Sequence, residues 1–76
     1  MTWYRIGDVC RQLDEEPHVL RFWESEFQLR PNRSKKGQRV YTEAHLAKLR
    51  LIRFLVRDEL YTLEGAKRQI RRLNEW

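Results

Sequence analysis

The sequence predicts a mainly α-helical fold with one small β-hairpin, and three observations support this prediction. Two short segments with a helical period, residues 6–13 and 17–27, are separated by only three polar residues, a spacing typical of a helix-turn-helix. A stretch rich in cations and turn-forming residues follows them and favours a hairpin. Segments 42–59 and 62–76 then recover the helical period. Since 76 residues suit one small core, we expect a single domain over residues 1–76.

Composition limits the functional classes. Sixteen Lys and Arg residues against 11 Asp and Glu residues give a net charge of +5, which favours a polyanionic partner. The single cysteine, Cys10, cannot form an internal disulfide, and with only two histidines beside it we expect no metal and no cofactor. The sequence has no paired-carboxylate pocket, no Ser-His or Cys-His arrangement and no glycine-rich phosphate loop, so we do not expect an enzyme.

The N-terminus carries charges where a signal peptide would need its apolar stretch. No apolar run approaches the roughly 20 residues that cross a bilayer. We therefore expect a soluble, cytoplasmic, nucleoid-associated protein with no membrane partner.

The first helix is expected over residues 6–13, because Val9, Cys10 and Leu13 recur at helical spacing. Cys10 is interpreted as a small buried apolar residue. The β-prone residues 3–6 favour a short extended lead-in. The three polar residues after the helix form a tight turn into the next one.

The second helix, residues 17–27, has two faces of different character. Pro17 suits the first helical position, and no further helix breaker follows it. The apolar face carries Val19, Leu20, Trp23 and Phe27. The outward face carries His18, Arg21, Phe22 and Ser25. Phe22 beside Arg21 suits a nucleic-acid surface; the alternative is that Phe22 packs under a neighbouring loop.

Residues 28–41 are expected to form the β-hairpin, with its tip near residues 34–37. Gly37 can take a positive φ at this tip, and residues 39–41 have strand propensity. The stretch contains no acidic residue, and its cations are Arg30, Arg33, Lys35, Lys36 and Arg39. Such a run can be a flexible solvated loop, but beside a helix-turn-helix it favours a wing that contacts phosphates.

The longest helix is expected over residues 42–59, with Thr42 as its N-cap. Its apolar residues fall into two sectors, so we expect this helix to pack on two sides at the centre of the core. One sector holds Leu46, Leu49, Ile52 and Val56, and the other holds Leu51, Phe54 and Leu55. A third sector holds Arg50, Arg53 and Arg57, which we interpret as a solvated face rather than a second line of phosphate contacts.

The last helix follows a short break at Leu60 and Tyr61, and Thr62 is its expected N-cap. Its inward residues are Leu63, Ala66, Ile70 and Leu73. Its outward cations are Lys67, Arg68, Arg71 and Arg72. These cations suit the negative C-terminal end of the helix dipole, so a structural role accounts for them.

Four short motifs occur in order along the chain. They are Tyr4-Arg5-Ile6-Gly7-Asp8-Val9, Pro17-His18-Val19-Leu20-Arg21-Phe22-Trp23-Glu24, Gly37-Gln38-Arg39-Val40-Tyr41 and Thr62-Leu63-Glu64. Together they are distributed over nearly the whole chain, and they resemble the DNA-binding domain of the MerR family of bacterial transcriptional regulators. The resemblance implies a winged helix-turn-helix with about four helices and two wings. The second helix would enter the major groove, the hairpin would be the first wing, and the break between the last two helices would be the second wing.

The resemblance also implies roles for individual residues. Arg21 would face DNA from the recognition helix, and Arg39 would be the arginine of the first wing. Phe22 and Trp23 would take the places of the family's usual pair of aromatics. Because these two residues lack tyrosine hydroxyls, their contacts would be apolar, edge-on or through the Trp23 N–H group.

Two glycines that are common in the family are replaced in this sequence. Asp14 stands in the turn between the first two helices, and Leu60 stands at the end of the third helix. Aspartate tolerates a left-handed backbone conformation, whereas leucine does so poorly. The second wing is therefore the part of the fold that the resemblance specifies least.

These patterns lead to the hypothesis of sequence-specific binding to double-stranded promoter or operator DNA for transcription regulation. The expected DNA-contacting residues are His18, Arg21, Phe22, Ser25, Arg33, Lys35, Lys36, Arg39 and Tyr41. Wing cations would give salt-dependent affinity for phosphates, and the second helix would contact base edges or thymine methyl groups. The alternatives are an excisionase-like protein that bends DNA and a basic module that binds an acidic protein.

Regulators of this family typically continue into a dimerising helix and an effector-binding region. Residues 1–76 could thus be the excised N-terminal domain of a longer regulator, and we expect the full-length protein to be a homodimer through a region absent here. We expect the 76-residue chain alone to be a monomer, because its apolar residues are needed for the core.

Overall fold

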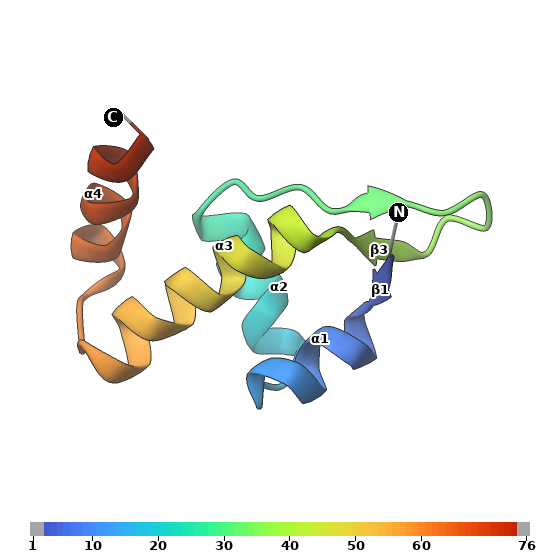
Figure 1. The fold of residues 1–76 in the computed structure, drawn as a ribbon, viewed down its shortest axis with the longest axis horizontal. Helices are drawn as coiled ribbons and strands as arrows, with labels where there is room; N and C mark the ends of the chain where they lie inside the picture. Colours follow the sequence, from blue (N-terminus) through green and yellow to red (C-terminus); the bar gives the residue numbers. More distant parts are fainter. Residues whose placement is uncertain (1–2, 75–76) are drawn as a thin grey trace.

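The computed structural model describes residues 3–74, and Figure 1 shows how its elements are arranged. The elements are β1 (Tyr4–Arg5), α1 (Ile6–Leu13), α2 (Pro17–Glu26), β2 (Asn32–Arg33), β3 (Arg39–Tyr41), α3 (Glu43–Arg53), the π-helical turn η1 (Phe54–Asp58) and α4 (Leu63–Asn74). The prediction of a mainly helical fold with a small hairpin is confirmed.

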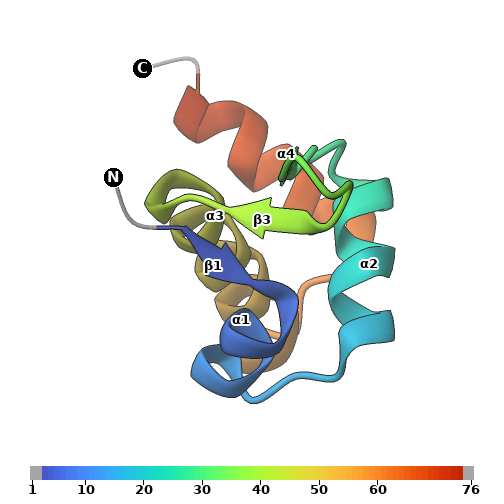
Figure 2. The ribbon, with the colours of Figure 1, turned by 90° about the vertical axis from the view of Figure 1, so that its right-hand side faces the viewer.

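The core lies where α1, α2 and α3 meet, beside the end of β3. Its fully buried side chains come from all four elements, since Val9, Leu20, Tyr41 and Leu49 each have 0% exposure. Figure 2 shows α3 passing behind β1 and α1, with α2 beside them. Cys10 packs against this core as a free thiol, but it is half-buried rather than buried as predicted.

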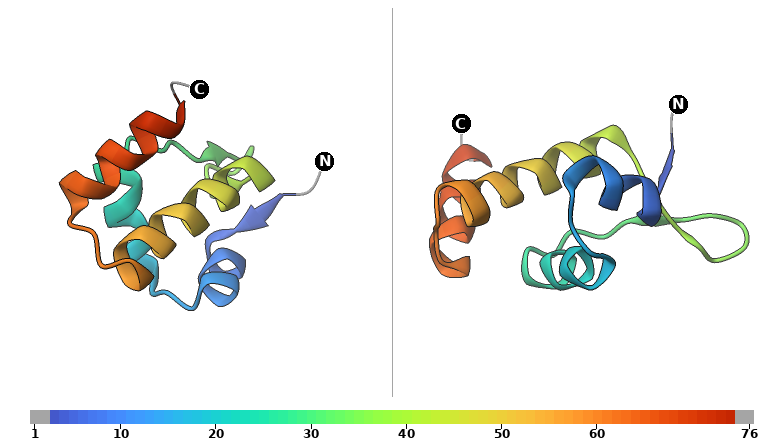
Figure 3. Two further views of the ribbon diagram at one scale, coloured as in Figure 1. Left: turned by 60° about the vertical axis from the view of Figure 1, so that its left-hand side comes forward. Right: turned by 90° about the horizontal axis from the view of Figure 1, so that it is seen from below.

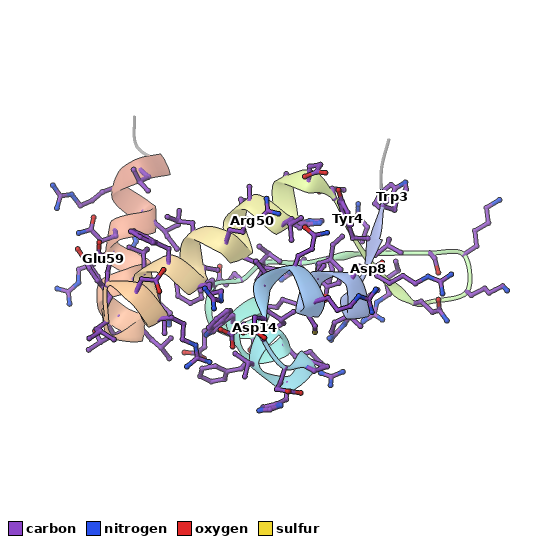
Figure 4. All side chains as sticks on the ribbon, turned by 60° about the horizontal axis from the view of Figure 1, so that its bottom comes forward. Trp3, Tyr4, Asp8, Asp14, Arg50 and Glu59 are labelled. Atoms are coloured by element: carbon purple, nitrogen blue, oxygen red, sulfur yellow. The ribbon has the colours of Figure 1, made fainter. Side chains whose placement is uncertain are left out.

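The helix-turn-helix formed by α1 and α2 has clear local causes. The Asp8 carboxylate accepts a hydrogen bond from the Arg5 N–H group at 3.1 Å and so stabilises the start of α1. Asp14 adopts a left-handed conformation, with φ of 53°, directly after α1. Pro17 then occupies the first turn of α2. The aspartate thus adopts the left-handed conformation that it was expected to tolerate, and Figure 4 shows it between the two helices.

The hairpin belongs to a three-stranded antiparallel sheet with the strand order β1-β3-β2. Gly37 has the expected positive φ, at 81°, and its N–H group donates to the Ser34 carbonyl at 2.9 Å. The predicted hairpin is therefore confirmed, and Figure 1 shows it extending away from the helices. Pairing of β1 with β3 was not predicted, and it places Tyr4 opposite Tyr41.

The third helix departs from the prediction in its last turn. Thr42 is its N-cap as predicted, because its Oγ1 accepts from the His45 N–H group at 3.3 Å. After Arg53 the α-helix changes to the wider π-helical turn η1. In this turn the Glu59 N–H group donates to the Phe54 carbonyl at 2.9 Å. In this segment Leu55 is buried, at 7% exposure, whereas Phe54 is 47% exposed. The predicted core position of Phe54 is therefore wrong.

The last helix, α4, begins after Leu60, which adopts the left-handed conformation with φ of 56°. Oγ1 of Thr62 accepts from the Gly65 N–H group at 3.0 Å, which confirms the predicted cap. Ala66 is fully buried, but Leu73 is 52% exposed, so its predicted inward position is wrong. The reason is visible in Figure 3, where the C-terminal end of α4 extends beyond the neighbouring helices.

Two arginines of the third helical segment hold the turn between α1 and α2. The Glu15 carboxylate, with a side chain only 7% exposed, accepts from Arg57 Nε at 3.0 Å and from Arg57 Nη2 at 2.9 Å. Arg53 Nε forms an ion pair with the same carboxylate at 3.2 Å. Arg57 also lies over the Trp23 ring, 5.6 Å from its centroid. Arg50 and Arg57 are exposed, as the interpretation of a solvated face expects, but Arg53 and Arg57 also pair with a carboxylate that, being nearly buried, requires charged partners.

Candidate nucleic-acid interface

The exposed face of α2 carries the four residues that the sequence placed there. His18, Arg21 and Ser25 are exposed, and Phe22 is 49% exposed. On the opposite face, Leu20 and Trp23 are buried at 0% and 2% exposure. The alternative in which Phe22 packs under a loop is therefore wrong. The helix presents three polar side chains and one aromatic ring to solvent.

An arginine-rich groove of about 660 Å³ lies between the start of α1, the helix α2 and the hairpin. Its arginines are Arg5, Arg11, Arg21, Arg33 and Arg39. The acidic residue in its lining is Asp8, whose carboxylate pairs with Arg11 and accepts from the Arg5 backbone. The groove therefore carries a strong positive charge, and a concave surface of one sign of charge concentrates a polyanion.

Arg39 lies between this groove and a second hollow of about 390 Å³, which Arg21, Ser25 and Arg30 also line. Among the described residues, the buried Nη1 atom of Arg39 has no hydrogen-bond partner. A buried donor without an acceptor is uncommon in proteins. A phosphate oxygen would supply the missing acceptor, and arginine suits this partner well.

The cations at the hairpin tip lie apart from the exposed face of α2. Lys35 and Lys36 are exposed and line neither the arginine-rich groove nor the second hollow. Nη1 of Arg33 donates to the Gly37 carbonyl at 3.0 Å, so this arginine also holds the turn. The hairpin thus offers positive charge along its whole length, from the groove to the tip.

Tyr41 does not belong to this surface, and its predicted contact with DNA is wrong. Its side chain has 0% exposure, and its hydroxyl donates to Oε2 of Glu24 at 2.7 Å. Burial, followed by the hydrogen bond to Glu24, raises the pKa of Tyr41 above its ordinary value. The cause is position: Tyr41 ends the central strand where the strand meets the core, although it is only two residues from Arg39.

Three arginines of these hollows were not predicted as site residues. Arg11 lies on the exposed side of α1, and the helical period of residues 6–13 could have indicated this. Arg30 was recognised as a hairpin cation without a place in the site. Arg5 reaches the groove because β1 pairs with β3, and no local pattern signals that pairing.

A helix-turn-helix whose second helix lies beside a basic β-hairpin defines the winged helix-turn-helix class. The chain belongs to the MerR HTH family of regulatory proteins, which it matches over residues 4–73. Within residues 3–74, no helix combines the length and the apolar character that a bilayer span requires.

A solved structure has the same fold. It is HiNmlR, a MerR family regulator lacking the sensor domain, bound to promoter DNA. The two structures agree with a TM-score of 0.77 at 25% sequence identity, and the match covers 88% of this chain. It covers 51% of the HiNmlR chain, so the present chain spans about half the length of HiNmlR. A comparison with curated proteins gives no match.

Proposed function

We propose that this chain is a DNA-binding domain of a transcriptional regulator that recognises a specific double-stranded promoter or operator sequence. The arginine-rich groove beside the exposed face of α2 is the observation that carries the proposal. DNA presents closely spaced phosphates beside a major groove that admits an α-helix. The helix α2, called the recognition helix from here on, enters the major groove of the DNA. The hairpin, called the wing from here on, lies along the DNA phosphates.

The two surfaces have different tasks in this proposal. The wing cations Arg33, Lys35, Lys36 and Arg39 bind phosphates, which position the protein but carry no sequence information. The recognition helix contacts base edges through His18, Arg21, Phe22 and Ser25. Arginine is well suited to a guanine, whose O6 and N7 atoms accept two hydrogen bonds from one guanidinium group.

We also propose that residues 1–76 form a single domain without catalytic activity, the N-terminal domain of a longer regulator. The full-length protein is a homodimer through a region outside these residues, and it is located with the nucleoid in the cytoplasm. The match to HiNmlR supports this part of the proposal, because it covers only 51% of that regulator's chain.

The proposal is tested by selecting duplexes from a random double-stranded library with the 76-residue chain. We expect enrichment of a defined sequence, called the preferred duplex from here on, and an affinity that falls steeply as salt rises. Binding without enrichment of any sequence would instead indicate an architectural protein that bends DNA. Absence of DNA binding at low salt would contradict the proposal and favour an acidic protein as the partner.

A further inference from the structure

The structure describes every residue of the recognition helix, and Phe22 is the one large apolar side chain on the exposed face of that helix. Its side chain is 49% exposed, whereas Leu20 and Trp23 already fill the buried face at 0% and 2% exposure. The core therefore does not account for this phenylalanine. Its neighbours on the exposed face are all polar, so this face suits a partner that offers an apolar group among polar ones.

The helix geometry separates Phe22 from Arg21. Arg21 lines the arginine-rich groove together with Arg33 and Arg39, so it lies on the side of the recognition helix that faces the wing. Phe22 follows one residue later, about 100° further around the helix axis, and it lines neither hollow beside the wing. The two side chains thus meet different base pairs when the helix lies in the major groove.

The chemistry of a phenyl ring limits what Phe22 can recognise there. The ring has no hydrogen-bond donor or acceptor, so it cannot distinguish the polar patterns of the four base pairs. The apolar group that the major groove presents is the C5-methyl group of thymine. We infer that Phe22 is a specificity-determining residue that packs against the methyl group of a thymine, on the side of the recognition helix away from the wing. This inference rests on the proposed DNA binding and adds the identity of one recognised group.

Deoxyuridine provides the direct test, because it differs from thymidine only in lacking the methyl group. Each thymine of the preferred duplex is replaced singly by deoxyuridine, and the affinity of the chain is measured. We expect one position at which the replacement weakens binding about fourfold, the effect of one buried methyl group. Phe22→Ala should weaken binding to the unmodified duplex and show no further loss with deoxyuridine at that position.

Two matched variants complete the test. Phe22→Leu retains an apolar side chain and should retain sensitivity to deoxyuridine. Ser25→Ala, on the same exposed face, should leave that sensitivity unchanged. The melting temperature of each variant is measured as well, because Phe22→Ala should melt close to the wild type.

The inference and the proposed function fail in different ways. If no duplex is enriched, the proposed function fails. If a preferred duplex exists but deoxyuridine has no effect, or has the same effect in Phe22→Ala, DNA binding stands and the inference is overturned. A preferred duplex that requires no thymine, or a Phe22→Ala protein that unfolds early yet binds the duplex normally when folded, would also overturn the inference.

Discussion

The hydroxyl group of Tyr41 donates a hydrogen bond to Oε2 of Glu24 at 2.7 Å, and this contact joins the wing to the recognition helix. Tyr41 has 0% exposure and Glu24 has 6%, so the bond is shielded from water. It ties the end of β3 to α2, and thereby fixes the wing arginine Arg39 relative to Arg21. A surface that contacts phosphates and bases at the same time benefits from such a fixed spacing, because less conformational entropy is lost on binding.

Removing the hydroxyl group tests this contact. Tyr41→Phe keeps the buried ring but leaves the Glu24 carboxylate without its donor, so we expect a loss of about 1 to 3 kcal/mol in the free energy of unfolding. Urea denaturation measures this loss. Tyr61→Phe changes a more exposed hydroxyl group and serves as the control, with a smaller expected effect. Equal stability of Tyr41→Phe and the wild type would show that the bond contributes nothing to the fold.

The same residue predicts a dependence of stability on alkaline pH. The pKa of Tyr41 is raised by burial and by Glu24, whereas an unfolded tyrosine has a pKa of about 10. This difference contributes stability that is fully present below pH about 10 and is lost as the pH rises above it, because only the unfolded chain ionises there. Tyr4, whose pKa is raised by its hydrogen bond to Glu43, contributes in the same range. Denaturation across this range should show that the free energy of unfolding falls less steeply with pH in Tyr41→Phe than in the wild type. An equally steep fall in both proteins would contradict the expectation.

Charge removal at the tip of the wing should weaken DNA binding without changing sequence preference. Lys36 is exposed, so Lys36→Ala removes a phosphate contact with little effect on the fold. We expect the slope of the logarithm of the binding constant against the logarithm of the salt concentration to become shallower by roughly 0.9 for the lost contact. Lys48→Ala, at an exposed lysine of α3, is the charge-matched control and should leave the slope unchanged. A changed preference with an intact salt slope would mean that the wing contacts bases.

The two adjacent aromatic residues of the recognition helix should respond oppositely to truncation. Trp23 has 2% exposure and contacts Arg57, so Trp23→Ala should lower the free energy of unfolding by about 3 to 5 kcal/mol. Phe22→Ala should change stability far less and should weaken binding to the preferred duplex. Thermal melts together with DNA titrations measure both properties. Similar destabilisation by the two variants would place Phe22 in the core.

Local patterns predicted most of the helical fold, because their causes lie within a few residues. The period of Val9 and Leu13, Pro17 at the start of α2 and Thr42 and Thr62 as caps each act within one or two turns. The exposed face of α2 followed from the same period. These features could therefore be predicted without knowledge of the rest of the chain.

Features that depend on distant partners could not be predicted in this way. Tyr41 is buried because β3 lies between β1 and β2 and ends at the core, not because of its immediate neighbours. Arg57 serves the fold because Glu15, 42 residues away, needs a charged partner. The π-helical turn η1 at the end of the third helical segment is likewise not indicated by the helical period of the sequence.

The most direct test of sequence recognition by the exposed face of α2 is the affinity of Arg21→Ala for two duplexes, the preferred one and a scrambled one of the same composition. Arg21 is exposed, so its removal should leave the fold intact. If Arg21 holds a guanine through two hydrogen bonds, binding to the preferred duplex should weaken by about 1 to 3 kcal/mol, and binding to the scrambled duplex should change much less. An equal loss on both duplexes would reduce Arg21 to a phosphate contact, and no loss on either would contradict DNA recognition by this face of the helix.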